Sequence, residues 1–191
     1  MYWKDEGYLL SKNNFDENSI IIETFTLKHG KYTGIVYGGS SRKQKGKFQT
    51  GNKLLLNWKS KAENKSGYFN IELIKPVSPY FFDDKKRSVC ILSATSILKI
   101  LLPERQVNKK IYNFFENMLA DLRSDNWIKI YINWELSLIK ELGFEANLKT
   151  NYNDDIKTAL TFNRNLLMEN FIIPNRLKFP LFRNILENYF L

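Results

Sequence analysis

Cysteine and histidine are almost absent from this sequence, which has one of each, Cys90 and His29, among 191 residues. A single cysteine excludes a disulfide framework and a cysteine-based zinc site. Cys90 lies in an apolar run, where a packed core thiol is predicted instead of a nucleophile. His29 lies in the segment LKHGK, which predicts a surface turn, and one histidine without a cysteine partner forms no nucleophilic pair.

Catalytic signatures are also missing. The sequence contains no GxxxxGKS/T phosphate loop and no GxGxxG, HExxH or GxSxG motif. Its two aspartate doublets, Asp83-Asp84 and Asp154-Asp155, stand alone in polar segments, which is typical of solvated loop acids and not of a metal pair. We therefore predict a protein that is not an enzyme and uses no metal or cofactor. A hydrolase or nuclease is the least favoured class.

Long hydrophobic runs are absent as well. No segment reaches the roughly 18–20 apolar residues that a membrane span needs. The first ten residues carry acids early and have no apolar core, so no signal peptide is predicted. We expect a cytoplasmic protein that does not enter a membrane.

Acidic residues are missing from Lys28 through Ala62, although the whole chain carries 20 Asp+Glu against 29 Lys+Arg, a net charge of +9. The excess is uneven: residues 1–76 hold 13 Lys+Arg and 7 Asp+Glu, and residues 77–191 hold 16 and 13. A strongly basic chain favours an anionic partner, which can be nucleic acid, an acidic membrane surface or an acidic peptide.

The basic loop, residues 37–53, lies inside this acid-free stretch. Its glycines interrupt any regular element, and its cations are Arg42, Lys43, Lys45 and Lys47. Exposed Lys and Arg side chains neutralise phosphates and release counterions, which dominates nucleic-acid affinity. On charge alone, the alternative is a solvated hairpin loop that only keeps the protein soluble.

Aromatic side chains lie on or beside the basic loop, at Tyr32, Tyr37, Phe48 and Trp58. Bases can stack on such rings while cations follow the backbone of a single strand. At least half of these rings are expected in the core instead, and the sequence leaves open which ones. The residues that we expect to contact DNA are Lys31, Arg42, Lys43, Lys45, Lys47, Lys53, Tyr37 and Trp58.

The first part of the chain alternates apolar and polar residues with the period of a strand. Leu54, Leu56 and Trp58, for example, share one face. Gly7 is a candidate bulge, and residues 12–18 are expected to form a turn. Five short antiparallel strands in so short a segment predict a small closed OB-type barrel over residues 1–76. The expected strands are 2–11, 19–27, 32–37, 54–59 and 69–75.

After Pro76 the period changes to that of helices, so residues 77–191 are predicted to form an all-α bundle. Gly143 is expected to end one helix, and Pro180 is well placed in the first turn of the last one. The chain is therefore expected to have an α+β fold in two domains, 1–76 and 77–191. The helices are expected at 90–101, 111–122, 127–142, 156–172 and from 180 onward.

Taken together, several segments resemble the family of the bacterial DNA repair protein RecO in their order and spacing. They are WKDEGYLLS, ENSIIIETFTLKHGKYTGIVYGGSSRK, GNKLLLNW, LLPER, WELSLIKELGF and the closing TFNRNLLMENF and LKFPLFRNIL. The resemblance implies an N-terminal OB fold, a helical domain and a non-enzymatic mediator. Such a mediator binds single- and double-stranded DNA, anneals complementary strands and, with RecR, displaces single-stranded-DNA-binding protein (SSB) to help RecA load.

The resemblance also implies where contacts lie. The four loop cations fall where the family has its basic loop. The family commonly carries a longer insert, often with a four-cysteine zinc site, after the WELSLIKELGF helix. Here a short polar segment without cysteine or histidine follows Gly143, so zinc is predicted to be absent and any RecR contact of the insert is in question.

The family docks the acidic tail of SSB on its helical domain, and charge suggests Arg105, Lys109, Lys110 and Arg123 as partners for such a tail. A hypothesis from another class is an OB-plus-helix adaptor that binds acidic protein tails and not DNA. Titration with a short oligonucleotide and, separately, with an SSB-tail peptide distinguishes the two hypotheses.

Overall fold

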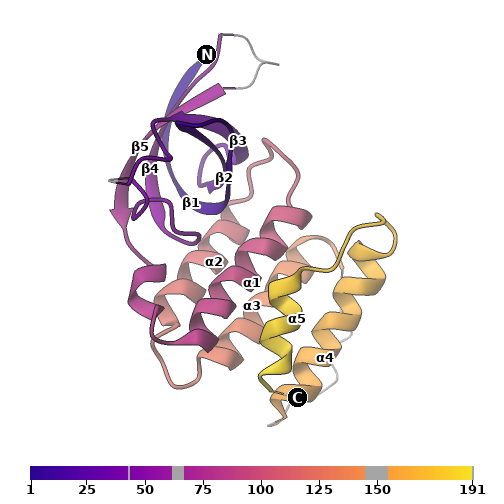
Figure 1. The fold of residues 1–191 in the computed structure, drawn as a ribbon. Helices are drawn as coiled ribbons and strands as arrows, with labels where there is room; N and C mark the ends of the chain where they lie inside the picture. The colour runs from indigo at the N-terminus through magenta and orange to yellow at the C-terminus, as the bar shows by residue number, and fades with distance from the viewer. Residues whose placement is uncertain (43, 62–66, 145–154, 191) are drawn as a thin grey trace. The chain divides into compact units, whose positions relative to one another are not determined.

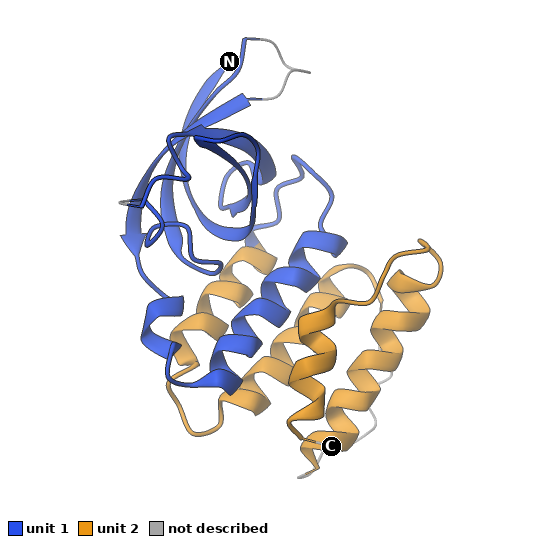
Figure 2. Ribbon diagram, in the orientation of Figure 1, with its two compact units in different colours: residues 1–109 blue, residues 110–191 orange. Residues whose placement is uncertain are grey.

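The computed structural model describes residues 1–42, 44–61, 67–144 and 155–190. Within them, five strands precede the helices, which confirms the predicted α+β class (Figure 1). The chain forms two compact units, Met1–Lys109 (unit 1) and Lys110–Leu191 (unit 2), coloured separately in Figure 2. Unit 1 therefore includes a first helix besides the strands. The domain division expected after Pro76 stays a prediction.

The strands close into a barrel in the order β1-β2-β3-β5-β4. The pairing of β3 with β5 is parallel, at Gly34–Gly67 and Ile35–Tyr68, whereas the other pairs are antiparallel. The expectation of a wholly antiparallel sheet was wrong at this seam, because closure brings two non-consecutive strands together. The OB-type architecture is as expected. The bounds are β1 Tyr2–Asn14, β2 Ser19–Thr26, β3 Gly30–Tyr37, β4 Lys53–Lys59 and β5 Gly67–Lys75.

Strand β1 continues beyond its predicted end. Lys12, Asn13 and Asn14 pair with Ile22, Ile21 and Ile20 of β2, so the start of the polar segment that we predicted as a turn is strand. The shift in register lies between Leu9 and Ser11 and not at Gly7. Gly7 is needed for a different reason: a Cβ there would lie 2.8 Å from the carbonyl oxygen of Phe25.

The barrel core follows the alternation in the sequence. Leu54, Leu56 and Trp58 of β4 are all buried, as are Phe69 and Ile71 of β5. The loop residue Phe48 belongs to the same buried cluster. Burying an aromatic side chain of this kind contributes about 2 kcal/mol or more, so the basic loop is attached to the barrel by packing.

Unit 1 continues with a 3-10 turn, η1 (Ser78–Phe81), and the helix α1 (Lys85–Leu101). The side chain of Asp84 caps α1 by accepting from the backbone N–H of Arg87 at 3.0 Å. Lys99 of α1 pairs with Glu23 of β2 at 2.8 Å, so the helix is tied to the barrel by charge as well as by packing. Cys90 is fully buried on α1, as predicted.

Unit 2 is helical, as predicted from the change of period. Gly143 ends α3 with φ +96°, a conformation that favours glycine. Pro180 stands at the N-cap of α5, one position before the first turn. No helix in the described parts of the chain is long and apolar enough to cross a membrane. The elements are α2 Lys109–Asp121, α3 Trp127–Glu141, α4 Ile156–Leu167, the π-helical turn η2 Met168–Ile172 and α5 Leu181–Asn188.

Candidate nucleic-acid interface

The basic loop is built from successive hydrogen-bonded turns. The N–H of Ser41 donates to Gly38 at 3.2 Å, that of Gln44 to Ser41 at 3.0 Å, and that of Lys47 to Gln44 at 2.9 Å. Phe48 then enters the barrel core. These bonds and the buried ring give the loop a defined path, so its cations project from a fixed support.

Asn52 holds the end of the loop. Its fully buried side chain donates to the carbonyl oxygens of Gly46 (3.3 Å) and Lys47 (3.2 Å). Its Oδ1 accepts from the backbone N–H groups of Val77 (2.8 Å) and Ser78 (3.3 Å). One amide therefore fastens the basic loop to the segment that follows β5. The sequence analysis did not single out Asn52, because an asparagine after a glycine indicates only a turn.

The cations of the loop are not consumed by folding. Arg42 and Lys45 are exposed and Lys47 is half-buried. Among the described residues, none of the three has a carboxylate within ion-pairing distance. Lys43 lies outside the described residues. The positive charge of the loop is thus available to an external anion.

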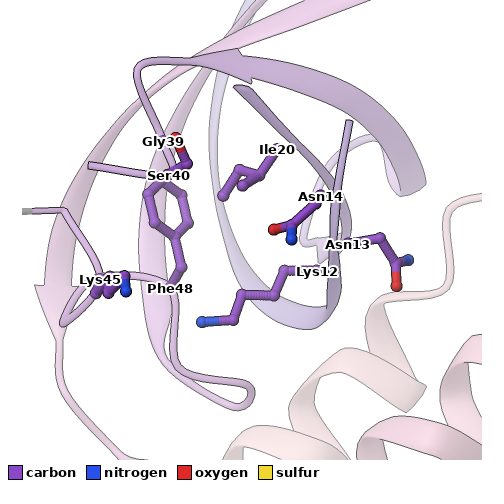
Figure 3. A pocket seen from close by; sticks show the side chains of 8 residues that line it. All are labelled: Lys12, Asn13, Asn14, Ile20, Gly39, Ser40, Lys45 and Phe48. Carbon is purple, nitrogen blue, oxygen red and sulfur yellow. The ribbon is translucent and has the colours of Figure 1, made fainter. Parts of the chain in front are cut away.

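A cleft of about 650 Å³ opens between the loop, the end of β1 and the start of β2. Figure 3 shows Lys12 extending from β1 toward the loop that carries Phe48 and Lys45, with Ile20 and Gly39 on the other walls. Partial burial, and then repulsion from Lys45, lower the pKa of Lys12. Two ammonium groups therefore share this cleft, one from the loop and one from the sheet.

Lys12 was missed in the sequence. It lies outside the acid-free stretch, in a polar cluster that indicated a turn. Only the pairing of Lys12 with Ile22 extends β1 far enough to bring this side chain under the loop. The run of isoleucines in β2 was the signal that the sequence offered for a longer β1. A strand that pairs with β2 along its whole length must be about as long as β2.

Comparison with known proteins gives a consistent result along the chain. Residues 1–77 match the family model "Recombination protein O N terminal", and residues 83–154 match "Recombination protein O C terminal". The DNA repair protein RecO of Wolbachia sp. subsp. Drosophila simulans (strain wRi) is 32% identical over 164 residues, which is 85% of this chain and 68% of that protein. The chain belongs to the RecO family.

Other RecO proteins are equally similar. That of Roseobacter denitrificans is 33% identical over 82% of this chain and 67% of its own length. One from Cereibacter sphaeroides is 34% identical over 78% of this chain and 62% of its own length. The family is one of DNA repair proteins, and the basic loop and the cleft both fall within its N-terminal model.

Three expected contact residues of this RecO-family chain are placed differently from the loop cations. Lys53 pairs with Glu6 at 2.9 Å. The Nζ of Lys31 donates to the carbonyl oxygen of Lys99 at 2.7 Å, and burial lowers its pKa. Trp58 is 1% exposed, in the core, so it presents no ring face to a base and its assignment as a stacking residue is corrected.

The other three aromatic rings on or beside the loop differ in burial, a point that the sequence left open. Phe48 is buried, Tyr32 is partly buried against the core, and Tyr37 at the end of β3 is 67% exposed. The centroid of the Tyr37 ring lies 6.1 Å from that of Tyr68 on β5, which is 41% exposed. Tyr68 was not predicted, because only the parallel β3–β5 seam brings it beside Tyr37.

The residues expected to bind an SSB tail do not form one cluster within either unit. Arg105 and Lys109 belong to unit 1, and Lys110 and Arg123 belong to unit 2. Lys110 and Arg123 lie near opposite ends of α2, about 20 Å apart along the helix axis. Lys110 also pairs with Glu141 at 3.4 Å. Their role in binding an acidic tail stays a prediction.

His29 has a more specific place than the predicted surface turn. Its Nδ1 lies 2.9 Å from Oδ2 of the buried Asp5, and its ring stacks on Trp3 with centroids 4.3 Å apart. Asp5 also accepts from the N–H of Lys28 at 2.7 Å. The histidine therefore joins the β2–β3 turn to β1. Within the described residues, no cluster of His, Cys, Asp and Glu could hold a metal ion.

Proposed function

We propose that this RecO-family protein binds single- and double-stranded DNA and anneals complementary strands as a mediator of recombinational repair. The observation that carries the proposal is the set of cations Arg42, Lys45 and Lys47, which have no ion-pair partner among the described residues, on a loop fixed to an OB-type barrel. Annealing needs contacts to the backbone that leave base edges free, and cations on a loop supply them. The activity requires no catalytic residue.

The proposal extends to partners. The protein acts in the bacterial cytoplasm on SSB-coated single strands and, with RecR, helps RecA to load onto them. The acidic SSB tail binds through exposed cations outside the barrel strands, for which Arg105, Lys109, Lys110 and Arg123 are the candidates. Family membership supports the repair role, and the charge of these residues supports the choice of an acidic tail.

Replacing Arg42, Lys45 and Lys47 together with alanine is expected to flatten the salt dependence of DNA binding. Each lost phosphate contact removes about 0.7 from the slope of log K against log salt for a single strand, so the triple variant loses about 2. The measurement is fluorescence anisotropy of a labelled oligonucleotide between low and moderate salt. The matched control removes three exposed lysines of unit 2, Lys140, Lys157 and Lys178, and keeps the slope. Equal slopes for the wild type and the loop variant would exclude the loop from the interface.

Replacing Lys109, Lys110 and Arg123 with alanine is expected to separate the two proposed activities. This variant anneals naked complementary strands at the wild-type rate, because the loop is intact. On SSB-coated strands its annealing rate falls roughly tenfold, because the electrostatic attraction to the acidic tail is lost. Arg105 is retained because its guanidinium lies 5.5 Å from the centroid of the Tyr32 ring.

The assay measures annealing of a fluorophore–quencher oligonucleotide pair with intact SSB and with SSB that lacks its tail. Tail removal should slow the wild-type reaction to the level of the variant. A variant that anneals SSB-coated strands as fast as the wild type would refute this tail site and leave the DNA-binding proposal standing.

A further inference from the structure

The cleft that holds Lys12 and Lys45 has a neighbour. A second cavity, of about 260 Å³, is lined by Tyr37, Tyr68 and Gln44. Gly39 and Phe48 line both cavities, so the two lie back to back across the base of the basic loop. One cavity carries cations and the other carries aromatic rings, which complement the two parts of a nucleotide, its anionic phosphate and its aromatic base.

The first cavity suits an anion with several oxygens. Lys12 and Lys45 reach it from opposite walls, and no carboxylate is among the described residues that line it. Asn14 also points into the cleft in Figure 3 and adds an amide donor, whereas Asn13 is turned away. Burial, and after it repulsion from Lys45, lower the pKa of Lys12, and an anion between the two ammonium groups would relieve the repulsion. A phosphate has the charge and the acceptors to do this.

The loop is held tightly over this cleft. A Cβ at Gly39 would lie 2.6 Å from a side-chain carbon of Ile20, so only glycine lets the loop approach the end of the sheet so closely. Ser40 fixes the same turn by donating from Oγ to the carbonyl oxygen of Glu17 at 2.9 Å. The relative placement of Lys12 and Lys45 is therefore set by the fold before any ligand arrives.

The second cavity presents ring faces. The rings of Tyr37 and Tyr68 are tilted by 53° with centroids 6.1 Å apart. A base sandwiched between two parallel rings would need roughly 7 Å, twice the roughly 3.4 Å step of stacked bases. The pair thus offers one outer face, that of the more exposed Tyr37, to a single base. Such stacking depends little on sequence because every base has a π-face.

We infer, on the basis of the proposed DNA-binding function, that these cavities form adjacent subsites for one single strand. A backbone phosphate lies between Lys12 and Lys45, and the base of a neighbouring nucleotide stacks on Tyr37. A duplex can use the phosphate subsite but not the aromatic one, because its bases already stack on one another. The site therefore favours single-stranded over double-stranded nucleic acid, and Lys12 is a binding residue outside the loop.

The phosphate subsite is tested with Lys12→Ala, using a fluorescein-labelled oligodeoxythymidylate as the probe. The salt slope is expected to fall by about 0.7, the value of one contact. Lys4→Ala is the matched control, since Lys4 is an exposed lysine of the same strand, and it leaves the slope unchanged. Lys12→Arg keeps the charge and restores the slope, which separates the loss of a contact from a disturbed fold.

The aromatic subsite is tested with Tyr37→Leu against the same oligonucleotide and against a blunt duplex of equal length. Loss of one stacked base weakens single-strand binding by about 5- to 150-fold. Duplex binding and the salt slope stay at wild-type values. Tyr80→Leu is the control, because Tyr80 of η1 is 57% exposed, comparable to Tyr37, but lies outside both cavities.

The outcomes separate this inference from the proposed function. If the wild type binds neither probe at low salt, the proposed function fails. If it binds DNA but Lys12→Ala behaves like Lys4→Ala, the phosphate subsite is wrong and the proposed function stands. If Tyr37→Leu weakens single-strand and duplex binding equally, the stacking subsite and the predicted strand preference are wrong.

Discussion

Replacing Arg183 with methionine is expected to lower the free energy of unfolding of unit 2 by about 3–5 kcal/mol. The guanidinium is fully buried, with Nε 2.6 Å and Nη2 3.2 Å from the two carboxylate oxygens of Glu135. Burial disfavours its charge, but Glu135 and Glu187 more than offset this and raise the pKa of Arg183. Methionine fills much of the volume but leaves Glu135, itself fully buried, without its cation.

The remaining partners of Glu135 cannot replace that charge. Tyr131 donates its hydroxyl at 2.6 Å and Asn163 its amide at 3.1 Å, which satisfies lone pairs without neutralising the carboxylate. Combining Arg183→Met with Glu135→Gln is therefore expected to recover at least about half of the lost stability. Glutamine removes the buried charge and keeps one acceptor oxygen, which serves Tyr131 or Asn163 but not both, because the two donate to different oxygens of Glu135.

Urea denaturation followed by tryptophan fluorescence measures these differences. Lys110→Met is the matched control, because Lys110 is exposed and the loss of its pair with the half-buried Glu141 should cost no more than about 1 kcal/mol. A loss of less than about 1 kcal/mol for Arg183→Met would show that the buried pair does not hold α3 and α5 together. The salt slope of DNA binding should not change, since the basic loop belongs to unit 1.

Local periodicity is enough to predict most elements of this fold. The alternation at Leu54, Leu56 and Trp58 correctly gave a strand and its buried face. The same alternation also argues against the assignment of Trp58 as a stacking residue, because a ring on the same face as two buried leucines points into the barrel and not toward a ligand. Tyr37, at the last position of β3, had no such constraint; its ring is exposed, and its contact with DNA stays a prediction.

The features that the sequence did not reveal depend on pairings between distant residues. Lys12 reaches the cleft only because β1 matches the full length of β2. Tyr68 meets Tyr37 across a parallel seam whose register no local pattern specifies. Glu135 and Arg183 are 48 positions apart in the sequence. Taken alone, each is only a charged residue on an otherwise apolar helix face, which does not indicate its partner. Charge composition indicated the kind of partner, while strand pairing determined which cations line the cleft.

Asn52→Ala is expected to destabilise unit 1 by about 3 kcal/mol and to release the basic loop. Four backbone groups, the carbonyls of Gly46 and Lys47 and the N–H groups of Val77 and Ser78, lose their partner at once; the bond to Val77 is buried and the other three are partly buried. Each unsatisfied group costs about 1–3 kcal/mol, less whatever water recovers in the space left by the amide. Asn57→Ala is the control, because Asn57 on β4 is only half-buried and bonds the exposed hydroxyl of Tyr2.

Trypsin cleavage measures the release of the loop directly, because trypsin cuts after Lys and Arg and the loop contains Arg42, Lys45 and Lys47. Under native conditions the loop of Asn52→Ala should be cut faster than that of the wild type or Asn57→Ala, because local opening exposes the backbone. The variant keeps all of its cations but should bind DNA less tightly, because ordering a loosened loop on binding costs entropy. Identical cleavage rates in all three proteins would show that the loop holds its turns without Asn52. The attachment through Phe48 would then suffice to position the cations.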